Sequence, residues 1–183
     1  RLRRGTLANF VGVVERDDWT MESWTERGAR ETALADFKGW HPTITRMLGE
    51  ADALYRWALF DRAPLPQWVD GRVGLLGDAA HPMLPFMAQG AAMAVEDAWV
   101  VAREMTQKTS PAQGLEAYQH LRQTRASRVQ AGSRANAKTF HKRTRLGQLA
   151  TYGPMWLAGK FAPMAAHKRQ DPIYGHDVTR LDK

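Results

Sequence analysis

Apolar residues recur at helical spacing in the first third of the chain. This spacing predicts a helix over roughly 28–38, with Gly39 as its stop. A second helix is expected to begin at Pro42, because proline at the first helical position lacks only an N–H that would have no partner there. The two helices should be short neighbours.

The middle of the chain predicts a longer helix over 89–107. Its polar residues fall within roughly 120° of the helical wheel and apolar residues cover the remainder, which indicates a helix buried on most sides. Glu96 and Asp97 lie on the polar face, where we expect them to be solvated. The alternative interpretation of this pair is two carboxylates for acid–base chemistry.

A still longer helix is expected from Pro111, with Ser110 as its N-cap, to about His141. Its expected packing residues are Leu115, Tyr118, Leu121 and Val129. The length of this helix suits a scaffold. Beyond it, the prolines and glycines of the tail predict short helical pieces followed by a closing turn in "QDPIYGHD".

Three stretches favour β-strands. Leu7–Glu15 is rich in β-branched and aromatic residues and follows the turn-like Arg4-Gly5, which predicts one strand of a hairpin. "ALYRWALFDR" (53–62) is interpreted as a second strand, and "APLPQW" as a proline-stiffened connector. "GRVGLLGD" predicts a short buried strand before Gly77. The aromatic residues expected in the core are Trp57, Phe60 and Trp68.

Composition excludes some classes of protein. The chain has 183 residues, 44% of them hydrophobic, enough for one core or a little more. It has no cysteine, so disulfides and thiolate metal sites are impossible; we expect no metal and a cytoplasmic location. No apolar stretch is long enough to span a bilayer, and no signal peptide is visible, so no membrane partner is expected. Because the chain begins with Arg1, we expect an N-terminal part to precede it.

The net charge of +7 raises the question of nucleic acid. The excess is local, because eleven Lys and Arg residues and no carboxylate lie between Glu116 and Asp171. Arg122 and Lys138 fall on nearly opposite sides of a helix, so these cations do not form one stripe for a phosphate backbone. A solvated helix is the favoured interpretation and nucleic acid is not the expected partner. Contact with an acidic neighbouring domain, or nucleic-acid binding after all, are the alternatives.

The stretch "GDAAHPMLPFMAQGAAMAVEDA" carries the candidate chemistry. A strand ends in Gly-Asp, a loop with two prolines follows, and a helix then starts with backbone N–H groups at Gly90, Ala91 and Ala92 that have no helical partner. The small residues let a ligand approach the backbone, which makes this start an anion site. Asp78 is placed to accept a hydrogen bond from a ligand hydroxyl. A polyol beside an anionic group fits both features.

This stretch resembles the class A flavoprotein monooxygenases, the aromatic-ring hydroxylases of the para-hydroxybenzoate hydroxylase fold, and among them the salicylate hydroxylase-like branch. Further similar segments are "NFVGVVERDDW", "ESWTERG", "WALFDRAPLPQW" and "DPIYGHD", so the resemblance covers nearly the whole chain. It implies an α+β fragment, the C-terminal half of an FAD- and NAD(P)-binding fold. Within it, 1–70 would be part of the substrate-binding domain, 71–108 the end of the FAD-binding domain, and 109–183 a C-terminal helical region.

The resemblance also implies roles for individual residues. Asp78 would bind the ribityl hydroxyls of FAD, with Gly77 and Ala79 forming the turn beneath them. The residues near the N1 and O2 edge of the flavin would be Gln89, Gly90, Ala91 and Ala92. Each role has a structural alternative: Asp78 as a cap and Gly90 as an ordinary helix-start glycine.

For the substrate, the resemblance places the loop with Pro85 and Phe86 at the aromatic pocket. The alternative for Phe86 is a core side chain. His81, next to Pro82, is interpreted as structural rather than as a base, and no catalytic residue is assigned.

The activity implied by the resemblance is hydroxylation of a phenolic, salicylate-like acid. NADH or NADPH would reduce FAD, and O2 would then add at flavin C4a to give a hydroperoxide. The chain lacks the glycine-rich turn that binds the FAD pyrophosphate in complete members. We therefore expect the missing N-terminal half as a partner and no activity from this chain alone; a homodimer is also considered. The alternatives are an inactive remnant or binding module, a nucleic-acid-binding protein, and a hydroxylase of another ring such as a hydroxypyridine acid.

Overall fold

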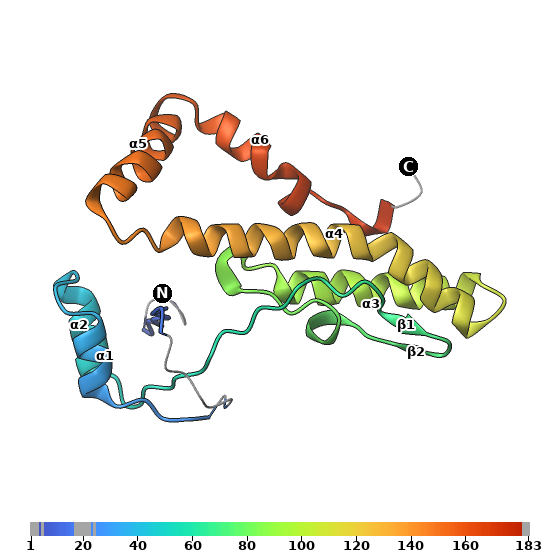
Figure 1. The fold of residues 1–183 in the computed structure, drawn as a ribbon, viewed down its shortest axis with the longest axis horizontal. Helices are drawn as coiled ribbons and strands as arrows, with labels where there is room; N and C mark the ends of the chain where they lie inside the picture. Colours follow the sequence, from blue (N-terminus) through green and yellow to red (C-terminus); the bar gives the residue numbers. More distant parts are fainter. Residues whose placement is uncertain (1–3, 5, 17–22, 24, 181–183) are drawn as a thin grey trace. The chain divides into compact units, whose positions relative to one another are not determined.

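The computed structural model describes residues 4, 6–16, 23 and 25–180, and for 165–167, 169 and 170 only the backbone. The chain divides into two compact units, residues 1–59 and 60–183 (Figure 1). This boundary lies eleven residues before the one expected at residue 70. The division into three domains stays a prediction.

The first unit is built around two short helices, as the sequence predicts. Helix α1 spans Arg30–Asp36 and helix α2 spans Pro42–Glu50, and the two contact each other. Pro42 occupies the first turn of α2, and the Nδ1 atom of His41 caps the helix by accepting the Thr43 N–H at 3.2 Å. Gly39, at φ +84°, allows the turn between the helices.

Both long strands expected in this region are wrong. Residues 8–16 have no regular secondary structure, and within 53–62 only Tyr55 forms a bridge, an isolated one to Arg27. A β-rich sequence becomes a strand only where a neighbour pairs with its N–H and C=O groups. Besides a single bridge at Leu7, the described residues supply only the Arg27–Tyr55 bridge. Gly5 of the expected turn lies outside the described residues.

The second unit begins with a small hairpin in place of one buried strand. Strand β1, Val69–Asp70, pairs antiparallel with strand β2, Val73–Gly74. Gly71 makes the turn at φ +56°. Strand β2 is exposed, so the prediction of burial is wrong there. Only the β1 side, with Trp68 and Val69, enters the core.

Two long helices carry the second unit, and both are confirmed. Helix α3 spans Gly90–Gln107 and helix α4 spans Pro111–Phe140, and they lie side by side (Figure 1). Ser110 Oγ caps α4 by accepting the Gln113 N–H at 3.3 Å. The main core cluster consists of Trp68, Val69, Ala80, Val100, Tyr118 and Ala126, with Leu115 and Leu121 packed against it.

Helix α3 buries a different face from the expected one. Its buried residues are Met93, Asp97, Val100 and Glu104, whereas Val95 and Trp99 are 70% and 46% exposed. The prediction that Glu96 and Asp97 are solvated is therefore wrong. The helical wheel identifies the two faces of a helix, but the neighbour decides which face is buried, and α4 brings arginines to the polar one.

The tail forms helix α5, Arg145–Phe161, and helix α6, Pro163–Tyr174, followed by a short 3₁₀ helix, Val178–Arg180. Tyr174 returns to the middle of the unit, where its hydroxyl donates to Met87 O at 3.0 Å. No helix in the described part of the chain is long and apolar enough to cross a membrane. Of the three aromatic residues expected in the core, Trp68 is buried, Trp57 is half-buried and Phe60 is exposed, so the prediction for Phe60 is wrong.

Candidate functional site

The Gly-Asp segment forms a tight 3₁₀ turn, Gly77–Ala79. Gly77 has φ +57°, and a Cβ there would lie 3.1 Å from the Ala94 Cβ, so both the backbone conformation and the approach of α3 require glycine. Gly77 is buried, whereas Asp78 and Ala79 are exposed. Gly77 thus packs against α3, whereas the Asp78 side chain is exposed.

The start of α3 is open. Gln89, the N-cap residue, forms no side-chain cap hydrogen bond, and it follows Ala88 in the left-handed conformation, φ +51°. The N–H groups of Gly90, Ala91 and Ala92 open the helix and have no acceptor within it. They carry the positive end of the helix dipole.

The turn and the helix start face each other. A Cβ built on Gly90 would lie 4.0 Å from Asp78 Oδ1 and 3.8 Å from Met83 Cγ, so the space beside Gly90 is bordered by the aspartate. Among the described residues, the Asp78 carboxylate has no hydrogen-bond or ion-pair partner. The structure therefore brings Asp78 and the first residues of α3 together, as the spacing predicts.

Side-chain amides on α4 hold the loop between the turn and the helix. Gln130 Nε2 donates to Pro82 O at 2.8 Å, and Asn136 Nδ2 donates to Phe86 O at 3.1 Å. The half-buried Phe86 ring meets the rings of Phe140 and His141 edge-on, with centroids 6.0 and 5.5 Å away. Pro85 is exposed. Phe86 is thus packed on one side, which leaves its two interpretations open.

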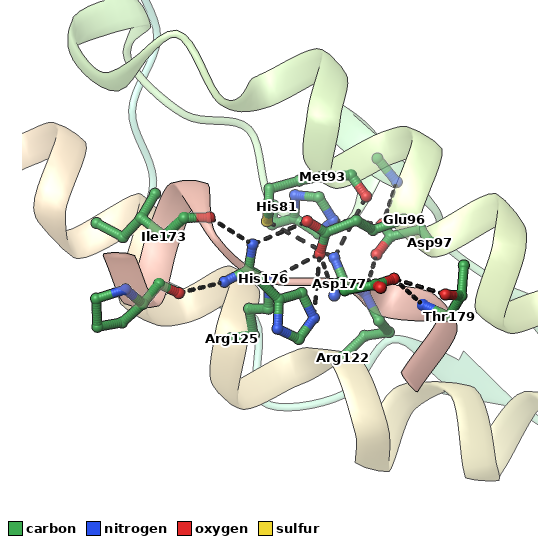
Figure 2. A network of polar contacts seen from close by, with 12 residues as sticks. His81, Met93, Glu96, Asp97, Arg122, Arg125, Ile173, His176, Asp177 and Thr179 are labelled. Carbon is green, nitrogen blue, oxygen red and sulfur yellow. Dashed lines mark hydrogen bonds and ion pairs between the residues drawn. The ribbon is translucent and has the colours of Figure 1, made fainter. Parts of the chain in front are cut away.

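A buried ion-pair network lies directly behind the turn (Figure 2). Asp97 Oδ2 accepts the Gly77 N–H at 3.1 Å and lies 2.5 Å from His81 Nε2. Asp97 Oδ1 accepts from Arg122 Nε at 2.8 Å. All three side chains, His81, Asp97 and Arg122, are at most 2% exposed. Burial raises the pKa of Asp97, but the hydrogen bonds from His81 and Arg122 outweigh it and hold the pKa below its usual value.

Glu96 extends the network toward the tail. It accepts from Arg122 Nη1 at 2.6 Å and from Arg125 Nε and Nη2 at 2.8 Å each. Arg125 also donates to the backbone carbonyls of Pro172 and Ile173. Burial raises the pKa of Glu96, but the two arginines lower it below its usual value overall. Burial and the neighbouring Arg125 lower the pKa of His176, whose Nε2 lies 3.9 Å from Glu96 Oε2.

Sequence reasoning missed the parts that depend on pairing across helices. The prediction that the cations of this basic stretch are solvated is wrong for Arg122 and Arg125. Arg134 is also paired, with Asp61. The available signal was the adjacent pair of carboxylates at 96 and 97 together with a basic helix that has no carboxylate after Glu116.

Comparison with known proteins identifies the cofactor. A family model described as an FAD binding domain matches residues 6–133. The 3-amino-4-hydroxybenzoate 2-monooxygenase of Streptomyces platensis is 38% identical over 141 residues, 76% of this chain and 36% of that protein. The 6-hydroxynicotinate 3-monooxygenase of Bordetella bronchiseptica is 44% identical over 137 residues, 73% of this chain and 35% of that protein.

Solved structures agree. A salicylate hydroxylase in a substrate complex matches with a TM-score of 0.67 and 28% identity, covering 92% of this chain and 40% of that one. Klebsiella pneumoniae HpxO, complexed with FAD and uric acid, matches with a TM-score of 0.61 and 28% identity, covering 69% of this chain and 34% of that one.

The Gly-Asp turn facing an open helix start thus occurs in a protein of the flavin-binding class. The chain belongs to the FAD-binding domain family, and the resemblance to class A FAD-dependent aromatic-ring monooxygenases is confirmed. The cofactor of this family is FAD. The chain spans about a third of the length of the curated relatives it matches.

Proposed function

We propose that this chain supplies the ribityl- and isoalloxazine-facing side of the FAD site in a monooxygenase that hydroxylates a phenolic aromatic acid with NADH or NADPH and O2. The observation that carries the proposal is the exposed, unpaired Asp78 carboxylate beside Gly90 at the open start of α3. The remainder of the FAD site, including the pyrophosphate-binding turn, is assigned to an N-terminal partner segment.

The described residues fit this part of FAD. Asp78 offers an acceptor for ribityl hydroxyls, and Gly77 and Ala79 form the turn that holds it. The bare N–H groups of Gly90, Ala91 and Ala92 suit the carbonyl-bearing edge of the flavin, with Gln89 beside them. Gly90 leaves the open space that a planar ring system needs against the backbone.

When bound, FAD supplies the redox and oxygen chemistry. The contribution of this chain is electrostatic. The positive end of the α3 dipole favours negative charge on the flavin edge that it faces, and this raises the reduction potential of the flavin. Because the donors belong to a helix already fixed against α4, they need little rearrangement as that charge develops.

The loop Pro82–Met87 is assigned to the substrate side. Pro85 and the exposed part of Phe86 would line the aromatic pocket. Gln130 and Asn136 fix the loop backbone, so it can exclude water from the reacting groups without closing as a lid. No residue of this chain is assigned as the catalytic base.

The names of the relatives favour a ring that carries both a hydroxyl and a carboxylate. A salicylate-like acid is the proposed substrate, on the likeness to salicylate hydroxylase. The second candidate is a hydroxypyridine acid, favoured by the 44% identity to a 6-hydroxynicotinate 3-monooxygenase.

The experiment uses the longest protein encoded by the gene that contains this chain. It measures NADH and NADPH oxidation with salicylate, hydroxybenzoates and 6-hydroxynicotinate, and product mass under labelled O2. We expect one acid to stimulate oxidation and to gain one labelled oxygen atom. A protein that binds FAD but hydroxylates none of these acids contradicts the proposed activity, and one that binds no FAD is the inactive remnant or binding module.

A further inference from the structure

One buried carboxylate holds both ends of the turn that presents Asp78. Asp97 Oδ2 accepts the Gly77 N–H and meets His81 Nε2, and the His81 backbone N–H in turn donates to Gly77 O at 2.9 Å. Gly77 starts the turn and His81 follows it. Asp97 is fully buried, so it contacts these groups and not solvent.

We propose that Asp97 is a positioning residue of the flavin site, which fixes Asp78 at the start of α3. Asp97 belongs to α3 itself, two turns beyond Gly90. By holding the turn to this helix, it sets where the Asp78 carboxylate stands relative to the free N–H groups. This inference rests on the proposed function, because it assigns Asp97 a role in binding FAD.

The two carboxylate oxygens of Asp97 have different partners, which distinguishes a positioning role from simple charge pairing. Oδ1 accepts from Arg122, whereas Oδ2 accepts the Gly77 N–H and meets His81 Nε2. A merely structural ion pair would affect the free energy of unfolding and leave FAD affinity unchanged. Positioning predicts a loss of affinity beyond the loss of stability.

Glu104 provides the matched control. It is a buried carboxylate on the same helix, but it pairs with Arg103 and Lys108, away from the turn. Glu104→Gln therefore removes a comparable buried charge from α3 without touching Gly77 or His81.

The experiment titrates FAD by fluorescence into the apoprotein of the longest gene product. We expect Asp97→Asn to raise the Kd for FAD about tenfold, whereas Glu104→Gln changes it less than about threefold. Without FAD, the Gly77 amide should exchange its hydrogen faster in Asp97→Asn than in Glu104→Gln, because it has lost a charged acceptor.

A double-variant cycle tests whether Asp97 acts through Asp78. The Kd of Asp78→Ala/Asp97→Asn should lie within about twofold of that of Asp78→Ala alone, because a misplaced turn costs nothing once its carboxylate is gone. Should Asp97→Asn fail to fold, His81→Leu and His81→Gln replace it: the leucine should weaken FAD binding, and the glutamine, which can still donate to Asp97, should restore most of it.

Wild-type affinity in Asp97→Asn, or losses that simply add in the double variant, would overturn the inference while the proposed function stands. A wild-type protein that binds no FAD overturns both.

Discussion

The Asp78 carboxylate borders the space above Gly90: a Cβ on Gly90 would lie 4.0 Å from Asp78 Oδ1. Eleven residues separate the two in sequence, and the intervening loop is pinned to α4 by Gln130 and Asn136. A negative acceptor and a row of free N–H donors are thereby offered to one ligand. A ligand that carries hydroxyl groups beside an electron-rich edge can use both the carboxylate and the N–H donors.

Gly90→Val should give a folded protein that does not bind FAD. The nearest atoms to a Cβ at Gly90 are at ordinary contact distance, so the branched side chain fits the protein but fills the space assigned to the flavin. Circular dichroism and flavin absorbance check the two halves of this prediction. Gly159→Val, at an open position in α5, is the control and should bind FAD normally. A yellow Gly90→Val protein with the wild-type reduction potential would show that the helix start does not meet the flavin.

Phe86→Ala should raise the Michaelis constant for the aromatic substrate and increase the hydrogen peroxide released per NADH oxidised. A substrate ring that is held less tightly adopts the reacting geometry less often. Phe140→Ala is the control, because it removes the ring that packs edge-on against Phe86 and leaves Phe86 itself in place. If Phe86→Ala only lowers the melting temperature, with coupling unchanged, Phe86 is a core side chain.

Arg122→Ala should destabilise the protein by about 3–5 kcal/mol, because it leaves the fully buried Asp97 without its cation. Urea denaturation measures this change. Arg128→Ala, at an exposed arginine on the same helix, should stay within about 0.5 kcal/mol of wild type. Equal effects of the two substitutions would contradict the network described behind the turn.

Stability should fall as the pH drops below about 4. Burial raises both pKa values, but Arg125 and Arg122 hold the pKa of Glu96, and His81 and Arg122 that of Asp97, below the usual value. The folded state therefore binds these protons less readily than the unfolded chain. Their contribution is therefore complete above the ordinary carboxyl pKa and is lost as the pH falls through the folded one. The lowered pKa of His176 acts in the same direction, starting near pH 6.5. Urea titrations at several pH values test this, and Glu96→Gln should flatten the acid limb.

Features that depend on interactions within a few residues were predicted correctly from the sequence. Ser110, Pro111 and His141 mark the ends of α4 because caps and proline act within one turn. The meeting of Asp78 with the α3 start followed from a turn and a helix only a short loop apart. A site formed within one strand–loop–helix unit can therefore be predicted from the sequence of that unit.

Strand pairing and ion pairs between helices could not be predicted in this way. Leu7–Glu15 has the composition of a strand, yet composition does not supply a partner strand. Asp97 looked solvated because the wheel of α3 contains no information about Arg122, which comes 25 residues later. The burial of a charge depends on its counter-ion, and that counter-ion lies on another helix.

The flavin content of the longest gene product decides whether this chain forms part of a flavin site. We expect a yellow protein with one FAD per chain, released on denaturation and measured by absorbance. An Asp78→Ala variant should lose FAD on dilution about tenfold more readily. The Asp70→Ala variant, at an exposed aspartate in the neighbouring hairpin, should retain FAD like the wild type. A wild-type protein that neither contains FAD nor binds it when it is added would show that Asp78 and the start of α3 do not form a flavin site.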